Sequence, residues 1–446
     1  MLKVIKPPSD KISKLWAKPE IKTDSCYRLM DYVLTAERGD TTILHNCVTG
    51  EMIALKCGKR LLSRLPAQYT PDLDLLIEKH FLVPCRHDDK RVVLQIRNAF
   101  RLMYPKKDII AYTILPTSDC NARCFYCYEC GIKHINMSPQ TADRVVDYIK
   151  EHHGDKEIIL KWFGGEPLLN KDIIDQICRS LKENGIAFTS NITTNGLLFS
   201  KELVSHGKEN WNLKDAQITV DGTEEIYNKT KSYINASSSP FYTVMDNIQQ
   251  LLTAGIAVKM RMNLSKVNGD DLKELIDYAA VRFKGEENFM PYVTPIYEGV
   301  GYKPIYYSDF DNAALELKKN ELNNLIKEYG FKLYETPLPA LSTGFCMADN
   351  DAAVLINPEG GIGKCEHHIF DSLIGSVYDK MPIAEEISLW KQTEEFDICD
   401  SCPLFPTCFI LKRCDRGGCN KFKKNNRITN FKESILNFYN EKACEE

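Results

Sequence analysis

The distribution of its cysteines constrains this chain more than any other feature of the sequence. Seventeen cysteines occur among 446 residues. Three of them lie on the eight-residue segment 120–127 and eight lie between 346 and 444, whereas the long middle of the chain holds only Cys178. Such groups are typical of metal-binding segments, in which the bound metal supplies structural constraints that a weak apolar pattern cannot.

Composition and the N-terminal sequence indicate the compartment and the classes of partner. The opening MLKVIKPPSDKISKLW has no apolar stretch long enough for a signal peptide, and no run of 18 apolar residues predicts a membrane span. We therefore expect a cytoplasmic protein, in which a disulfide framework is uncommon. The net charge of -4 gives no overall field that would attract nucleic acid or an anionic membrane, so we expect neither as a partner.

Between residues 106 and 310, apolar segments alternate with amphipathic helical patterns. The expected strands are 109–115, 158–163, 186–193, 216–221, 256–264 and 288–293. This alternation predicts parallel βαβ units. Six such units suit an α/β fold, a partial (β/α)6 TIM-like barrel, whose functional residues gather at the C-terminal ends of the strands.

The remaining sequence divides into three parts. Residues 1–105 predict a small α+β module, because two alternating runs flank Arg38-Gly39-Asp40 as in a hairpin and short helical patterns follow. Residues 311–345 predict a helical linker. Residues 346–446 contain closely spaced cysteines and little continuous apolar pattern, so we expect bound metal to organise them.

The first cysteine group follows the first expected strand and reads CNARCFYC. Thiolates of Cys120, Cys124 and Cys127 on one tight loop can bind three irons of a cubane cluster and leave the fourth iron open. A structural zinc site is the alternative, although structural zinc normally has four protein ligands.

The second expected strand ends in WFGGEP. The paired glycines Gly164 and Gly165 let the backbone come close to a ligand, and the Glu166 carboxylate can accept hydrogen bonds from an ammonium group. Taken alone, this sequence is a common strand-to-helix turn. One βα unit after the cysteine loop, it favours a binding site.

In this order, the two motifs resemble the radical S-adenosylmethionine (SAM) superfamily. The resemblance implies that Cys120, Cys124 and Cys127 are the catalytic residues, because they hold the four-iron four-sulfur (4Fe-4S) cluster that cleaves SAM to a 5′-deoxyadenosyl radical. The cofactor-binding residues that it implies are Tyr126, Gly164, Gly165, Glu166, Asn195, Thr219, Asp221 and Arg261. Where the family often has His-Asn and an arginine after the Asp-Gly pair, this chain has Tyr227-Asn228 and Lys231, which puts a SAM contact of Lys231 in doubt.

The C-terminal cysteines resemble a SPASM domain, an extension that holds two auxiliary 4Fe-4S clusters. The resemblance implies seven metal ligands, Cys346, Cys365, Cys399, Cys402, Cys408, Cys414 and Cys419, and three clusters in all. We expect Cys399, Cys402, Cys408 and Cys419 to hold one auxiliary cluster. The other would have Cys346, Cys365 and Cys414 and one open iron, unless Cys444 completes it. A zinc ribbon is the alternative for this region.

The layout resembles maturases of ribosomally synthesised peptides (RiPPs), such as the thioether-forming sactisynthases and ranthipeptide synthases. This implies a precursor peptide as partner, with its leader bound by a winged-helix-like module at residues 1–105, and a flavodoxin or ferredoxin as reductant. The module could instead be a lid over the barrel. The alternative activities are carbon–carbon crosslinking and anaerobic sulfatase maturation by formation of formylglycine. The non-enzymatic alternatives are an iron–sulfur electron carrier and a zinc-binding interaction protein.

The expected ligand sets lead to a first prediction. Replacing Cys444 by Ala should leave iron content and crosslinking intact, because Cys444 is the third residue from the end of the sequence, where chains commonly fray. Replacing Cys414 by Ala should remove cluster iron. Iron analysis of both purified variants tests this, and loss of a whole cluster from the Cys444 variant would refute the open site.

Overall fold

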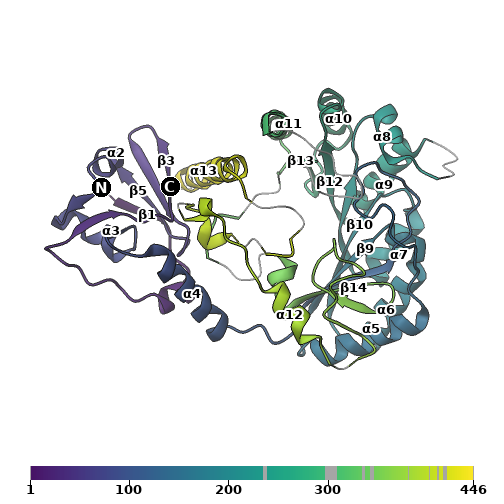
Figure 1. Cartoon of the computed structure of the whole chain (residues 1–446). Coiled ribbons are helices and arrows are strands. Elements are labelled where there is room, and N and C mark those ends of the chain that lie inside the picture. Colours follow the sequence, from purple (N-terminus) through teal and green to yellow (C-terminus); the bar gives the residue numbers. More distant parts are fainter. Residues whose placement is uncertain are drawn as a thin grey trace.

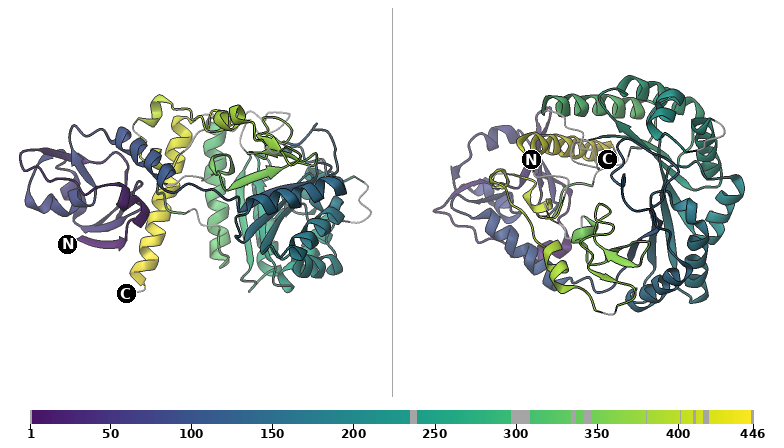
Figure 2. Two further views of the ribbon diagram at one scale, coloured as in Figure 1. Left: turned by 90° about the horizontal axis from the view of Figure 1, so that it is seen from below. Right: turned by 45° about the vertical axis from the view of Figure 1, so that its right-hand side comes forward.

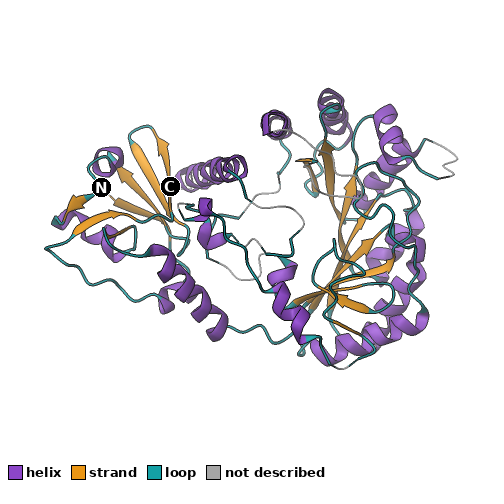
Figure 3. Cartoon of the chain, in the orientation of Figure 1, coloured by secondary structure: helices purple, strands orange, loops and turns teal. Residues whose placement is uncertain are grey.

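The computed structural model describes residues 2–234, 239–296, 309–333, 337–341, 346–379, 381–400, 402–408, 411–414 and 419–444. Within them, a curved sheet with helices on its outer face forms one part of the molecule, and a smaller module with two sheets forms another (Figures 1 and 3). Segments with little regular structure lie between the two parts. No helix among these residues is both long and apolar enough to cross a membrane.

Six parallel strands form the barrel, as the alternating pattern predicted. They lie side by side in chain order. Their bounds are β8 (Ala111–Thr117), β9 (Ile158–Gly164), β10 (Phe188–Thr194), β11 (Leu213–Thr219), β12 (Ala257–Leu264) and β13 (Phe289–Pro295). Along β10 and β13, buried and half-buried residues alternate, because one face of the sheet packs on helices and the other lines the barrel.

The outer layer consists of amphipathic helices (Figure 2). They are α5 (Pro139–His152), α6 (Lys171–Glu183), α7 (Lys201–Asn210), α8 (Glu224–Lys231), α9 (Pro240–Thr253), α10 (Gly269–Arg282) and α11 (Asp309–Glu328). Capping residues determine where such helices begin. At α5, the Ser138 side chain accepts a hydrogen bond from the Thr141 amide, and Pro139 occupies the first turn.

The C-terminal segment extends the barrel sheet. Strand β14 (Ala353–Ile356) pairs in parallel with β8, and β15 (Gly361–Gly363) and β16 (Gly375–Ser376) follow in antiparallel order. All four residues of β14 are buried. The sequence analysis did not anticipate this strand, because four apolar residues between polar turns are too short to show a period.

The N-terminal module contains a four-stranded antiparallel sheet and a three-stranded one. The first has the order β1 (Leu2–Lys6), β5 (Met52–Lys56), β4 (Thr41–Asn46), β3 (Val33–Arg38), and the second β6 (Ala67–Gln68), β2 (Cys26–Leu29), β7 (Leu82–Pro84). Its helices are α1 (Asp10–Leu15), α2 (Gly58–Leu62), α3 (Asp74–Glu78) and α4 (Asp89–Met103). The expected hairpin is β3 and β4, which turn at Gly39 with a φ of +60°.

One disulfide was not anticipated. Cys26 on β2 and Cys85, directly after β7, are joined across the three-stranded sheet, with their Cα atoms 5.6 Å apart. The two cysteines are 59 residues apart, so only the pairing of β2 with β7 brings them together.

The N-terminal module shares its core with the C-terminal part of the chain. After α12 (Ala384–Trp390), the long helix α13 (Lys421–Cys444) packs beside β3 and β4. Its Phe431 and Ile435 are buried in the module's core together with Leu404 and Phe405. The module is thus held by apolar contacts from the region that carries the C-terminal cysteines.

We predict that Ile435→Ala destabilises this shared core. Ile435 is 0% exposed, so the substitution should lower the free energy of unfolding by about 2–5 kcal/mol through lost burial and a cavity. Denaturant unfolding with hydrogen exchange of β3 and β4 measures this. Asn437→Ala, on the exposed side of the same helix, is the control and should change little.

Candidate active site

The first cysteine group forms a loop at the C-terminal end of β8. Cys120, Cys124 and Cys127 are half-buried on this loop, and the Ala122 amide donates to Cys120 Sγ at 3.4 Å. Burial raises the pKa of both Cys120 and Cys127 to about 12. These thiols need a nearby cation to become thiolates at neutral pH, which is what cluster iron supplies.

The ligands of a cubane cluster are arranged differently from those of a single metal ion. In the part of the chain that is described, no three His, Cys, Asp or Glu side chains converge as ligands of one metal ion. In a cubane each thiolate binds a different iron. Cubane ligands therefore lie farther apart than the four ligands of a tetrahedral zinc site.

The paired glycines at the end of β9 pack directly against the start of the cysteine loop. A Cβ on Gly164 would lie 2.2 Å from the Thr117 carbonyl oxygen, and one on Gly165 would lie 2.2 Å from that of Asp119. The Glu166 amide donates to the same Asp119 oxygen at 2.8 Å. The glycines therefore allow the loop that begins at Cys120 to rest on β9.

The Glu166 carboxylate is fully buried and accepts hydrogen bonds within the protein. Its oxygens accept from the Leu168 amide at 3.2 Å, the Thr194 hydroxyl at 2.8 Å and the Asn195 amide at 2.8 Å. Burial raises the pKa of Glu166 to about 7, while these hydrogen bonds act in the opposite direction. The carboxylate thus ties the end of β9 to the end of β10, and its proposed contact with SAM stays a prediction.

Asn195 reaches from β10 to the cysteine loop. Its side-chain amide donates to Asn121 Oδ1 at 2.7 Å, and the Asn121 carbonyl accepts from the Ile234 amide at 2.8 Å. Asn121 was not singled out from the sequence, because an asparagine between two cysteines carries no signal of a distant partner.

A buried ion pair holds the other side of the loop. Lys231 Nζ lies 3.1 Å from Asp221 Oδ2 and donates to the Tyr126 hydroxyl at 3.1 Å, and Tyr126 donates to Asp221. The Lys231 carbonyl also accepts from the Arg123 amide at 2.8 Å. Burial raises the pKa of Tyr126 well above its usual value, and the Asp221 charge adds to the rise. Lys231, whose contact with SAM the sequence put in doubt, thus helps to hold the cysteine loop in place.

Thr219, the last residue of β11, and Arg261, within β12, are register partners, so they lie side by side. Arg261 Nε donates to Asn263 Oδ1 at 2.9 Å, and the Asn263 amide donates to Asp221 Oδ1 at 3.0 Å. The two residues thus stand next to the ion pair, and their contact with SAM remains a prediction.

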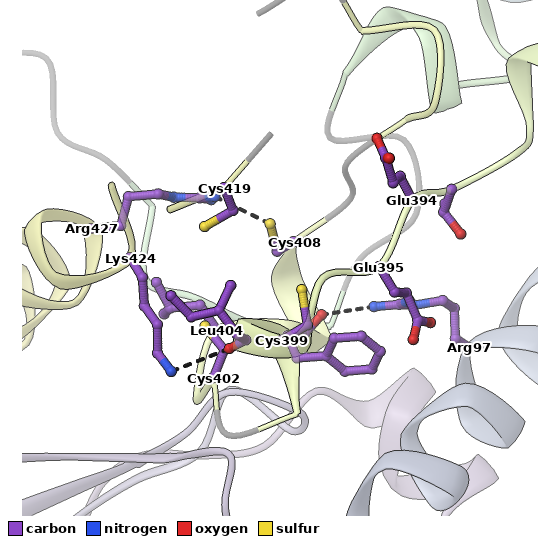
Figure 4. Close-up of a pocket in the computed structure, with 13 residues that line it drawn as sticks. Arg97, Glu394, Glu395, Cys399, Cys402, Leu404, Cys408, Cys419, Lys424 and Arg427 are labelled. Atoms are coloured by element: carbon purple, nitrogen blue, oxygen red, sulfur yellow. Dashed lines mark hydrogen bonds between the residues drawn. The ribbon is translucent and has the colours of Figure 1, made fainter. Parts of the chain in front are cut away.

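The C-terminal cysteines fall into two groups. Cys399, Cys402, Cys408 and Cys419 line one pocket, together with Arg97 of α4 and Lys424 and Arg427 of α13 (Figure 4). Arg427 donates to Cys408 Sγ at 3.2 Å. We call this group the distal site; its four members are those expected to share a cluster, and iron binding there is still a prediction.

The second group, Cys346, Cys365 and Cys414, is the proximal site. Burial, with smaller contributions from the neighbouring Cys346 and Cys414, raises the pKa of the Cys365 thiol to about 11. This site adjoins the first cysteine loop, because the ring centroids of Tyr128 and His367 are 4.4 Å apart. The side chain of Cys444 lies outside the described residues, so the expected alternative ligand is untested.

Comparison with known proteins identifies the barrel. Residues 114–279, from β8 to α10, match the model of the radical SAM superfamily. The chain carries a radical SAM domain. A radical SAM domain makes the chain an enzyme with SAM and a 4Fe-4S cluster as cofactors, and the three thiols after β8 fit such a cluster.

Two curated relatives illustrate the range of this superfamily. The chain is 29% identical over 271 residues to a GTP 3′,8-cyclase of Clostridium perfringens (strain SM101 / Type A), covering 56% of this chain and 78% of the relative. It is 24% identical over 346 residues to a cysteine-type anaerobic sulfatase-maturating enzyme of Clostridium novyi (strain NT), covering 70% of this chain and 87% of the relative.

Two solved structures share the fold. Native anSMEcpe with bound AdoMet has a TM-score of 0.57 at 14% identity, and the match covers 74% of this chain and 99% of that one. Streptococcus suis SuiB bound to precursor peptide SuiA has a TM-score of 0.51 at 16% identity, and the match covers 88% of this chain and 95% of that one.

The glycine contacts lead to a prediction. Gly165→Ala should displace Asp119 and the cysteine loop, because its Cβ would overlap the Asp119 carbonyl oxygen. We expect loss of the SAM-cluster iron and a fall in 5′-deoxyadenosine formation on the order of 10²-fold. Iron analysis and chromatography of the products measure both. Gly375→Ala is the control, because its Cβ would meet no atom closer than 3.8 Å.

Proposed function

We propose that this radical SAM enzyme is a peptide maturase that installs a crosslink, a cysteine thioether, in a ribosomally made precursor peptide. The observation that carries the proposal is the arrangement of three parts. A radical SAM barrel adjoins two groups of cysteines, and a module with its own sheets packs against the cysteine-bearing segments. The anSMEcpe fold covers 74% of this chain, whereas that of SuiB, which binds the precursor peptide SuiA, covers 88%.

The chemistry of a thioether sets requirements that the two auxiliary sites could meet. Joining a carbon to a cysteine sulfur breaks one C–H and one S–H bond and removes two electrons and two protons. One hydrogen atom goes to the deoxyadenosyl group, which leaves as 5′-deoxyadenosine, and the thiol releases a proton. When bound, the SAM cluster would supply the electron that cleaves SAM, and an auxiliary cluster would accept the remaining electron from the substrate.

The protein's own groups keep the reaction site ordered. Asp221, Lys231 and Asn195 fix the cysteine loop, whose three thiols would hold the SAM cluster. The N-terminal module would hold the leader by strand addition, since β1 and β3 are edge strands of its four-stranded sheet. A flavodoxin or ferredoxin remains the proposed reductant.

Sulfatase maturation is the second candidate. The match to the Clostridium novyi sulfatase-maturating enzyme over 70% of this chain favours it. In that reaction one cysteine of the substrate becomes formylglycine, and no crosslink forms.

Mass spectrometry distinguishes these functions. The enzyme would be coexpressed with a short cysteine-containing peptide encoded beside its gene. We expect loss of two hydrogens and a cysteine that iodoacetamide no longer labels, because its sulfur is bonded to carbon. Omitting the leader should reduce modification at least about tenfold by removing remote binding energy.

The controls and contrary outcomes are specific. The triple variant Cys120→Ala, Cys124→Ala, Cys127→Ala should make no 5′-deoxyadenosine and leave the peptide unchanged while keeping its auxiliary iron. Loss of two hydrogens with an alkylatable cysteine would indicate a carbon–carbon crosslink. Replacement of sulfur by oxygen with loss of two hydrogens would indicate formylglycine, and SAM cleavage by the triple variant would refute the cluster assignment.

A further inference from the structure

Helix α4 of the N-terminal module carries three basic residues on one face. Lys90, Arg97 and Arg101 are separated by seven and four residues, which places them along a single side of a helix. Val93 and Ile96 of the same helix are buried in the module's core and fix its position. We call these three residues the basic face of α4. Each contacts a segment that carries auxiliary cysteines.

Lys90 contacts the beginning of the distal site. Its Nζ lies 2.7 Å from Asp400 Oδ1 and 2.7 Å from Glu395 Oε2. Asp400 directly follows Cys399, so this ion pair lies next to a proposed cluster ligand. The paired carboxylates raise the pKa of Lys90, which keeps it charged.

Arg97 contacts the segment between Cys402 and Cys408. It is 6% exposed, and it donates to the carbonyl oxygens of Phe405 at 2.9 Å and Pro406 at 3.3 Å. Its guanidinium also lies 5.2 Å from the centroid of the Phe405 ring (Figure 4 shows Arg97 at the pocket). Burying a guanidinium is costly unless negative groups surround it, and this arginine lines the pocket of four cysteines.

Arg101 contacts the proximal site. It lies 2.7 Å from Asp349 Oδ1, whose side chain is 3% exposed. The Asp349 amide donates to the carbonyl oxygen of Cys346 at 3.1 Å. One helix of the N-terminal module therefore contacts the segments of both auxiliary sites.

We infer that the basic face of α4 positions both auxiliary cysteine segments and that Arg97 stabilises the negative charge of a cluster at the distal site. A cubane held by four thiolates carries net negative charge, and reduction adds to it. Nearby cations and hydrogen bonds therefore raise its reduction potential. The inference rests on the auxiliary clusters of the proposed function. Arg97 is then a positioning residue. The N-terminal module, which is proposed to bind the leader, also contributes side chains to the metal site.

The test measures iron and potential, not peptide modification. The parent is the full-length Cys120→Ala, Cys124→Ala, Cys127→Ala variant, so that only auxiliary iron contributes. Arg97→Gln in this parent should either lose the iron of one cluster or shift the distal midpoint potential to more negative values in an EPR-monitored titration with dithionite. Arg97→Lys keeps the charge but not the planar donor fork. Its iron content and distal midpoint potential should therefore lie between those of the parent and those of Arg97→Gln.

A matched control lies on the same helix. Arg91 is exposed on α4, so Arg91→Gln removes the same charge away from the cysteines and should leave iron and potential as in the parent. Arg101→Gln should alter the proximal signal alone, and it provides the same comparison if Arg97→Gln fails to fold.

The possible results distinguish the role of α4 from the existence of the auxiliary clusters. If Arg97→Gln and Arg101→Gln keep all iron and the same potentials as Arg91→Gln, the role of α4 is refuted while the auxiliary clusters stand. If the parent itself binds no iron, the auxiliary clusters are refuted, and the inference falls with them.

Discussion

The buried ion pair between Asp221 and Lys231 is the interaction on which the candidate active site depends. Both side chains are almost fully buried, so desolvation opposes the pair unless other groups satisfy it. Tyr126 and the Asn263 amide complete its hydrogen bonds, which joins the cysteine loop to the ends of β11 and β12. A loop rich in polar residues thereby acquires a fixed direction at the mouth of the barrel.

In the C-terminal half of the chain, too, contacts from distant segments hold the cysteine-bearing loops in place. Strand β14 continues the barrel sheet through buried pairing with β8, and α13 continues the core of the N-terminal module. The cysteines of the auxiliary sites lie on segments with little regular structure close to these two elements. Their cysteines are therefore placed by neighbours: Arg427 from α13, and Arg97 and Arg101 from α4.

The sequence predicted the barrel well, because the order of its strands and helices depends on local periods, whereas the assignment of the cysteines to clusters stays a prediction. The six expected strands are present, and they lie in chain order within one sheet. It missed β14, the Cys26–Cys85 disulfide and the role of α4, which all depend on contacts between distant segments. It also assigned Glu166 and Asp221 to SAM alone, whereas their carboxylates hold strand ends and the loop together.

By itself, the sequence determined the chemistry that this protein can carry, since three thiols at fixed spacing after a strand and two glycines after the next are properties of neighbouring residues. Only the tertiary structure decided which groups support that chemistry. Lys231 lies 105 residues from Tyr126, and Arg97 lies 308 residues from Phe405. Each of these contacts exists because the packing of strands and helices brings together segments whose separation in sequence leaves no periodic signal.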